Sequence, residues 1–155
     1  MVKHPEELGF KLGLTIRLGE PASITRSTHD ASTIRDVVYV ALLAENVGPL
    51  EKGDALKVGQ TKGSLMSRWG PIVGIFQRDN LRSNEKDDRR KWLEVASGKE
   101  ISIWLKAAGK IEVPYSQGLT KCLFSTRCAE EEFLDQYYEP KLGISLNRIS
   151  SEVTE

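Results

Sequence analysis

The sequence has few of the residues that build disulfide frameworks and metal clusters. It contains two cysteines, Cys122 and Cys128, and two histidines among 155 residues. Two cysteines do not make a disulfide framework, so both are expected to be reduced thiols, and a zinc cluster is not expected. No apolar run approaches the roughly 20 residues of a membrane helix, and the N-terminus has acids where a signal peptide needs an apolar stretch. We therefore expect a cytoplasmic protein without a membrane partner.

The chain also lacks a net charge, with 22 basic and 22 acidic residues, but the two signs are separated along it. Residues 57–91 hold nine basic and four acidic side chains, a formal +5. Residues 130–155 hold seven acids and two bases, a formal −5. A chain with segregated charge can present a basic face to phosphates while its total is neutral. Charge blocks are as often plain solvated faces, so this pattern permits a nucleic-acid partner without requiring one.

Alternation of apolar and polar residues predicts several strands in what is, by length, one domain. Residues 10–18 alternate strictly, which predicts a half-buried strand, and 23–29 is its expected partner. Residues 37–43 are apolar and β-branched at their start, as in a central strand buried on both faces. The segment 45–54 contains Asn, Pro and two Gly and predicts a loop. An antiparallel return strand is expected over 55–61.

The remaining segments predict three helices and one further strand. They are a short helix starting near Ser64 and limited or kinked at Gly70-Pro71, a helix over 84–96, a strand over 101–106, and a helix from Thr126 to about Tyr138. Together the elements predict an α+β domain with a small, mainly antiparallel sheet flanked by helices and extended by an N-terminal strand.

Four kinds of side chain on these elements match the needs of phosphodiester hydrolysis. A tyrosine or lysine, such as Tyr39 or Lys57, can position or deprotonate a water. The planar guanidinium of Arg68 matches the non-bridging oxygens of a phosphate. A glutamate in the last helix can hold a magnesium ion that keeps most of its waters.

In order and spacing these motifs resemble the GIY-YIG nuclease family over roughly residues 36–148. The family's first triplet corresponds to Val37-Val38-Tyr39, its second to Lys57-Val58-Gly59, and its helix arginine to Arg68. Its metal-binding glutamate lies in a helix followed by a proline and an asparagine, as in AEEEFLDQYYEPKLGISLN. Asn147 resembles that closing asparagine, and its expected role is to support the site through amide hydrogen bonds.

The chain departs from the family pattern at a few positions. Lys57 stands where most members have tyrosine, although some restriction-enzyme branches resemble this chain in using lysine. The first triplet lacks its glycine, and the loop between the two strands is several residues longer than usual. Ile72 stands where a histidine is often found, which leaves Tyr39 and Lys57 as the proton carriers.

The resemblance implies a DNA endonuclease that uses one Mg²⁺ or Mn²⁺ ion per site. It implies that Tyr39 orients or deprotonates the water with help from Lys57, that Arg68 stabilises the pentavalent phosphorus, and that a glutamate binds the metal. Residues 36–149 would form the nuclease domain, 1–35 an extension with one or two strands, and 150–155 a disordered tail.

Periodicity chooses among the three consecutive glutamates of the last helix. Glu130 is centred on the apolar stripe of Ala129, Phe133, Leu134 and Tyr137, where a carboxylate is costly without a partner such as a metal or Arg68. Counting back from Pro140, as in some family members, favours Glu131 instead. We prefer Glu130 as the metal ligand and keep Glu131 as the alternative.

Basic residues that follow the strand expected over 55–61 are candidate contacts to the DNA backbone. Such contacts position a duplex without reading its sequence. The candidates are Lys62, Arg78, Arg82, Arg89 and Arg90. A homodimer would allow a domain with one site to cut both strands. Two other interpretations stay open. One is a catalytically idle module of the same fold that binds DNA or protein, and the other is an unrelated α+β interaction domain with accidental motifs.

Overall fold

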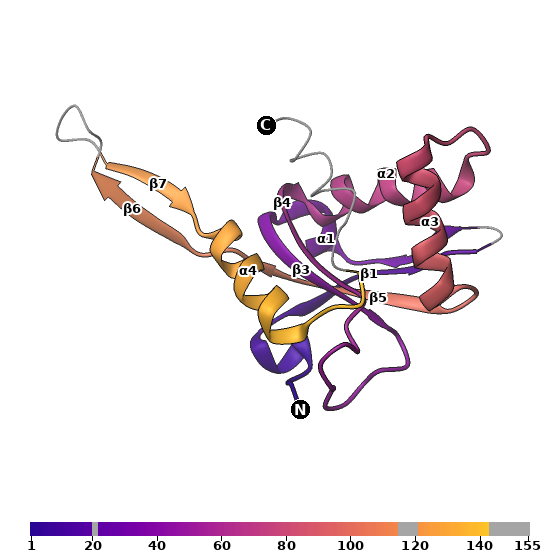
Figure 1. Ribbon diagram of the computed structural model, residues 1–155. Coiled ribbons are helices and arrows are strands. Elements are labelled where there is room, and N and C mark those ends of the chain that lie inside the picture. Colours follow the sequence, from indigo (N-terminus) through magenta and orange to yellow (C-terminus); the bar gives the residue numbers. More distant parts are fainter. Residues whose placement is uncertain (20–21, 115–120, 143–155) are drawn as a thin grey trace.

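A five-stranded sheet in the order β2-β1-β5-β3-β4 forms the centre of the protein (Figure 1). The computed structural model describes residues 1–19, 22–114 and 121–142. Every pair of neighbouring strands is antiparallel. The strands are β1 (Lys11–Arg17), β2 (Ser23–Ser27), β3 (Arg35–Leu43), β4 (Lys57–Ser64) and β5 (Glu100–Ala107). The expected α+β class, the mainly antiparallel sheet and the N-terminal strand extension are confirmed.

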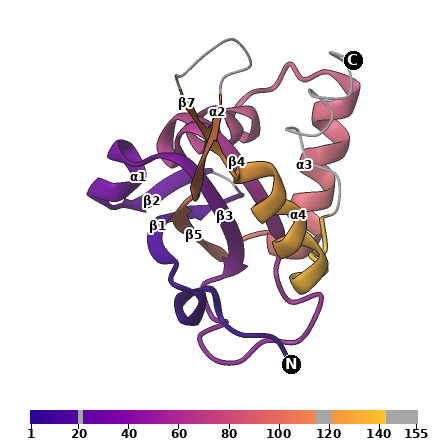
Figure 2. The same cartoon turned by 90° about the vertical axis from the view of Figure 1, so that its left-hand side faces the viewer.

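Helices lie on both faces of this sheet. They are α1 (His29–Thr33), α2 (Leu65–Gln77), α3 (Ser83–Ala96) and α4 (Arg127–Tyr138), and a 3₁₀ turn, η1, covers Pro5–Leu8. Buried residues of α2 and α3 pack with one face, whereas α4 and the N-terminal segment pack with the other. Figure 2 shows α4 alongside β4. None of the helices in the described ranges has the length and apolar character needed to cross a bilayer.

Strand β3 is buried on both faces, as its apolar composition predicts. Side chains alternate along a strand, so Tyr39 and Ala41 join the core beneath α2 and α3, whereas Val38 and Val40 join the core beneath α4. Strand β4 lies at the edge of the sheet and pairs only with β3 among the described strands. The long-looped hairpin expected from the sequence is therefore confirmed, and it puts β4 between the two helical layers.

Helix α2 differs from the expectation in its length. Ser64 is its N-cap, and the Ser64 hydroxyl accepts a hydrogen bond from the Ser67 N–H at 3.1 Å, as predicted. The helix does not end at Gly70-Pro71 but continues to Gln77. A proline inside a helix removes one backbone hydrogen bond. Here that loss is offset because α2 buries side chains on both sides of the proline, including Trp69 and Ile72.

A separate two-stranded sheet, β6 (Lys110–Pro114) and β7 (Lys121–Ser125), projects from the body beside α4 (Figure 1). The sequence analysis predicts no element there. Ile111 and Phe124 are paired across the two strands, and both are more than half exposed. Alternation of apolar and polar residues indicates a strand when one of its faces is buried. These apolar side chains are not buried in the core, so the hairpin has no buried face for such a pattern to indicate.

Candidate active site

Tyr39 and Lys57 lie together on the face of the sheet that α2 covers. In the β3–β4 pairing Tyr39 is opposite Gly59, and Lys57 is opposite Ala41. Tyr39 is fully buried and Lys57 is 2% exposed. The Lys57 Nζ lies 5.8 Å from the Tyr39 ring centroid and 5.5 Å from that of Trp69 on α2. An ammonium at such distances from two aromatic rings is attracted by their electron-rich faces. The structure thus brings together the aromatic and the basic residue of the two sequence motifs.

Gly59 makes room for the Tyr39 ring. A Cβ atom placed on Gly59 would overlap the Tyr39 Cζ and Oη atoms and would come within 2.7 Å of Cε1. The Tyr39 ring has a second neighbour, because it meets the Trp69 ring edge-on at a centroid distance of 5.6 Å. The second-triplet glycine is therefore required by the close approach of the phenol to the β4 backbone.

Replacing Gly59 by alanine is expected to destabilise the fold by about 1–3 kcal/mol or more, because the ring cannot move away from the added methyl group without disturbing Trp69. Gly74→Ala is the matched control. Gly74 lies inside α2 with nothing within 4 Å of an added Cβ, so the change should stabilise the helix by about 1 kcal/mol. Urea denaturation of both variants checks this, and wild-type stability of Gly59→Ala would contradict it.

Arg68 follows Ser64 by one turn of α2 and is half-buried. Its Nε and Nη2 atoms are buried and have no hydrogen-bond partner among the described residues. Arg68 lines a hollow of about 220 Å³ between α2 and α3, together with Arg82, Asn84 and Glu85 of the following turn and helix. Buried guanidinium N–H groups without acceptors are costly. The arrangement suits an anion with two oxygens that match the fork.

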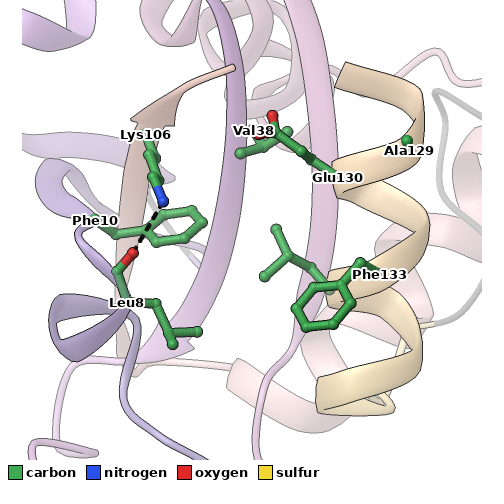
Figure 3. A pocket seen from close by; sticks show the side chains of 8 residues that line it. Leu8, Phe10, Val38, Lys106, Ala129, Glu130 and Phe133 are labelled. Atoms are coloured by element: carbon green, nitrogen blue, oxygen red, sulfur yellow. Dashed lines mark hydrogen bonds between the residues drawn. The ribbon is translucent and has the colours of Figure 1, made fainter. Parts of the chain in front are cut away.

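Glu130 lies on the other face of the sheet. It lines a groove of about 320 Å³ with Phe10, Val38 and Lys106 (Figure 3). Both of its carboxylate oxygens lie 3.3 Å from the Gly109 N–H, which donates to them. The apolar stripe that periodicity predicts is only partly buried, because Ala129 and Phe133 are exposed while Leu134 and Tyr138 are buried, and the Glu130 carboxylate meets a backbone amide. Helix α4, which carries Glu130, Glu131 and Glu132, packs on the other side of the sheet from α2, which carries Arg68.

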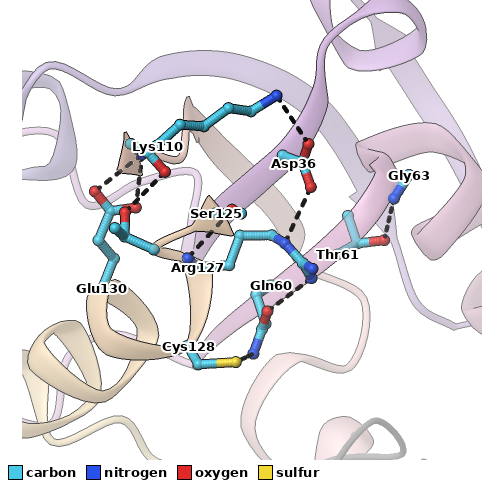
Figure 4. A network of polar contacts seen from close by, with 11 residues as sticks. Asp36, Gln60, Thr61, Gly63, Lys110, Ser125, Arg127, Cys128 and Glu130 are labelled. Atoms are coloured by element: carbon cyan, nitrogen blue, oxygen red, sulfur yellow. Dashed lines mark hydrogen bonds and ion pairs between the residues drawn. The ribbon is translucent and has the colours of Figure 1, made fainter. Parts of the chain in front are cut away.

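The start of α4 contacts strand β4 through two polar side chains. Cys128 Sγ accepts a hydrogen bond from Gln60 Nε2 at 3.2 Å, and Arg127 Nη1 donates to Gln60 Oε1 at 3.0 Å (Figure 4). These contacts hold the start of α4 against β4. Residues three apart share a helix face, so Glu131 shares a face with Cys128, and Glu130 shares one with Arg127. Glu131 is half-buried, whereas Glu132 is exposed.

Solved structures with a similar fold were found despite low sequence identity. A mutant of bacteriophage T4 EndoII superposes with a TM-score of 0.61 at 14% identity, over 90% of this chain and 95% of that chain. The chain has the fold of T4 EndoII. The restriction endonuclease HPY188I in complex with product DNA gives a TM-score of 0.46 at 12% identity, over 87% of this chain and 78% of that chain. No family model and no curated protein matches the sequence.

On this EndoII-like fold the candidate DNA-contacting residues line β4, α3 and the turn before α3. Lys62 and Arg82 are exposed. Arg78 forms an ion pair with Glu85 at 3.3 Å, and Arg90 forms one with Glu94 at 2.9 Å. Arg89 Nη1 donates to the Arg78 carbonyl at 3.2 Å. Of these candidates, Arg82, which directly precedes α3, lines the Arg68 hollow. Asn147 and the tail 150–155 lie outside the described residues.

Sequence reasoning missed two polar groups near the candidate site. Asp36, which has a positive φ of 56°, pairs with Arg127 Nε at 3.1 Å and thereby ties β3 to α4. Asp88 of α3 is 6% exposed. Burial raises the pKa of the Asp88 carboxyl above its usual 3.8, and the nearby Lys57 charge opposes that rise. The signal for Asp88 was its spacing of four residues from Trp92, which puts both on one helix face.

Proposed function

We propose that this protein is a DNA endonuclease of the GIY-YIG type, which hydrolyses phosphodiester bonds at a site formed by Tyr39, Lys57 and Arg68. The observation that carries the proposal is the Arg68 guanidinium, whose Nε and Nη2 atoms are buried without a partner among the described residues. Arg68 is followed along α2 by Trp69, whose ring lies 5.5 Å from the Lys57 Nζ. The shared fold with EndoII supports the same conclusion.

Arg68 is suited to hold the scissile phosphate. Its unpaired N–H groups form a planar fork that can donate to two phosphate oxygens at once. Negative charge grows on those oxygens as water adds to the phosphorus. Because the donors are already partly removed from water, they need little reorganisation when the charge develops, and this is the condition under which electrostatic stabilisation is largest.

Tyr39 and Lys57 would act on the water and on the phosphate charge. The Tyr39 hydroxyl lies against the β4 backbone at Gly59, where it can orient the attacking water or accept its proton through hydrogen bonding. The Lys57 ammonium is fixed between two aromatic rings and contributes a positive charge beside the phosphate. Water adds to phosphorus, the bond to the leaving oxygen breaks, and that oxygen takes up a proton.

A divalent ion, Mg²⁺ or Mn²⁺, completes the proposal, and Glu131 now replaces Glu130 as its candidate ligand. Within the described ranges no group of three or more His, Cys, Asp and Glu side chains is arranged to hold a metal. The chain's donors nevertheless fit Mg²⁺, which keeps several waters and takes one or two carboxylates together with phosphate oxygens. When bound, such an ion neutralises charge on the phosphate. Glu131 is chosen because the Glu130 carboxylate is engaged by the Gly109 N–H.

The test is nicking of supercoiled plasmid by the purified protein. We expect nicking in Mg²⁺, complete loss in EDTA and recovery when Mg²⁺ is restored in excess. DNA binding measured without metal should weaken as salt rises, because basic side chains of residues 57–91 release counterions from the phosphates. Salt-sensitive binding without nicking in either Mg²⁺ or Mn²⁺ would favour the idle binding module. Neither binding nor nicking would remove DNA as the partner.

A further inference from the structure

A buried acid on α3 faces the aromatic residues that surround Lys57. Asp88 and Trp92 are one turn apart on α3 and are both buried. The Trp92 ring meets the Trp69 ring edge-on at 5.7 Å, and the Lys57 Nζ lies over that same Trp69 ring at 5.5 Å. Residues four apart share a helix face. Asp88 therefore points from α3 toward the layer that contains Lys57.

The Asp88 carboxylate needs a compensating charge. Its Oδ2 atom is buried and has no hydrogen-bond partner among the described residues, and a buried charge is costly unless it is paired. Three charged groups act on it: Lys57 from β4, and Lys91 and Asp87 from its own helix. Lys57 exerts the stronger of the two attractive effects and, unlike Lys91, is itself buried. The Lys57 charge thus offsets part of the desolvation of the Asp88 carboxylate.

Resting on the nuclease function proposed above, we propose that Asp88 is a positioning residue that keeps the Lys57 side chain charged and fixed over Trp69. A nearby carboxylate favours the protonated form of an amine. Lys57 then serves the reaction as a fixed positive charge, and the water is left to Tyr39. This assigns Asp88, which lies in a helix outside the four sequence motifs, to the same site as Lys57.

The pairing is tested first by stability, without any need for activity. Asp88→Asn, Lys57→Met and the double variant are compared with the wild type by urea denaturation at pH 7.5. Each single variant is expected to raise the equilibrium constant of unfolding. In the double variant this constant should be at least tenfold smaller than the product of the two single effects predicts. Coupling below twofold would overturn the pairing. Should Asp88→Asn fail to fold alone, recovery of folding in the double variant supports the pairing, and failure to recover overturns it.

The role in the reaction is tested by the pH dependence of plasmid nicking. Removing the Asp88 charge in Asp88→Asn is expected to move the alkaline limb of the profile about one unit toward lower pH, because Lys57 then loses its proton more easily. Asp88→Glu should restore the wild-type limb. Glu94→Gln is the matched control, because Glu94 is exposed on the same helix and pairs with Arg90, and it should leave the limb in place. An unmoved alkaline limb in Asp88→Asn, or a moved acid limb instead, would overturn the role.

These two measurements separate the possible failures. If the wild type does not cut DNA but the stability coupling is present, the nuclease function fails and the Asp88–Lys57 pairing stands. If the wild type cuts DNA and the coupling is absent, the nuclease function stands and the positioning role of Asp88 fails.

Discussion

Plasmid nicking is expected to fall by at least about 10³-fold when Arg68 is replaced by alanine. The Arg68 guanidinium has buried donor groups that have no acceptor among the described residues, so its hydrogen bonds are available to the substrate. In the proposed reaction these donors meet the oxygens on which charge accumulates. Their removal therefore raises the barrier of the chemical step more than it weakens DNA binding. Initial rates of nicking at saturating DNA, set beside binding affinities, check this difference.

A lysine at the same position distinguishes the shape of the guanidinium from its charge. Arg68→Lys keeps the charge but loses the planar fork, so most of the activity should still be lost. Arg26→Ala is the matched control, because Arg26 is an exposed arginine on β2, the edge strand opposite β4. It should nick at the wild-type rate. Near-normal nicking by Arg68→Ala, with the Arg26→Ala control also normal, would show that the phosphate is held elsewhere.

The second large effect is expected at Glu131. Glu131→Gln keeps the size of the side chain but removes the negative charge that would hold a divalent ion, so nicking should fall by about 10²–10³-fold. Glu130→Gln should retain nicking within about twofold of wild type, because the Glu130 carboxylate is engaged by the Gly109 N–H. A glutamine oxygen can still accept that hydrogen bond.

The same pair of variants can be compared without measuring nicking. Binding of Mn²⁺ or Mg²⁺ to the wild-type protein with uncleaved DNA should be lost in Glu131→Gln and kept in Glu130→Gln. The reverse result, with Glu130→Gln inactive and Glu131→Gln active, would restore the choice that periodicity favours. Equal activity of both variants would remove α4 from the site.

Most of the sheet could be predicted from the sequence because its strands bury regular patterns. The alternation over residues 10–18 and the apolar run at 37–43 each report which faces are covered, and they became β1 and β3. The cap at Ser64 was equally readable, since its hydrogen bond is local. The end of α2 was not, because packing around Trp69 outweighs the helix-breaking tendency of Pro71. The β6–β7 hairpin was also missed, because its described apolar residues are exposed.

Part of the candidate site could also be predicted from the sequence, and part could not. The pairing of Tyr39 with Gly59 follows from a register that two adjacent strands impose, so the sequence motifs were enough to place Tyr39 and Lys57 together. The choice between Glu130 and Glu131 was not, because the apolar stripe on which Glu130 is centred is only partly buried, with Ala129 and Phe133 exposed. It depends on which neighbour each flank meets, and only the packed helix shows that one flank meets Gly109 and the other meets Gln60.

By itself, the order of residues determined the elements of the central sheet and the types of chemistry available, because both depend on neighbours close along the chain. Only the tertiary structure decided which side of the sheet each charged group occupies. It left two buried donor atoms of Arg68 without a partner among the described residues, turned Glu130 toward a backbone amide, and buried Asp88 where the charge of Lys57, 31 positions earlier in the sequence, acts on it. Those outcomes depend on helix docking, which is set by the packing of Trp69, Trp92 and Leu134 and not by any local pattern.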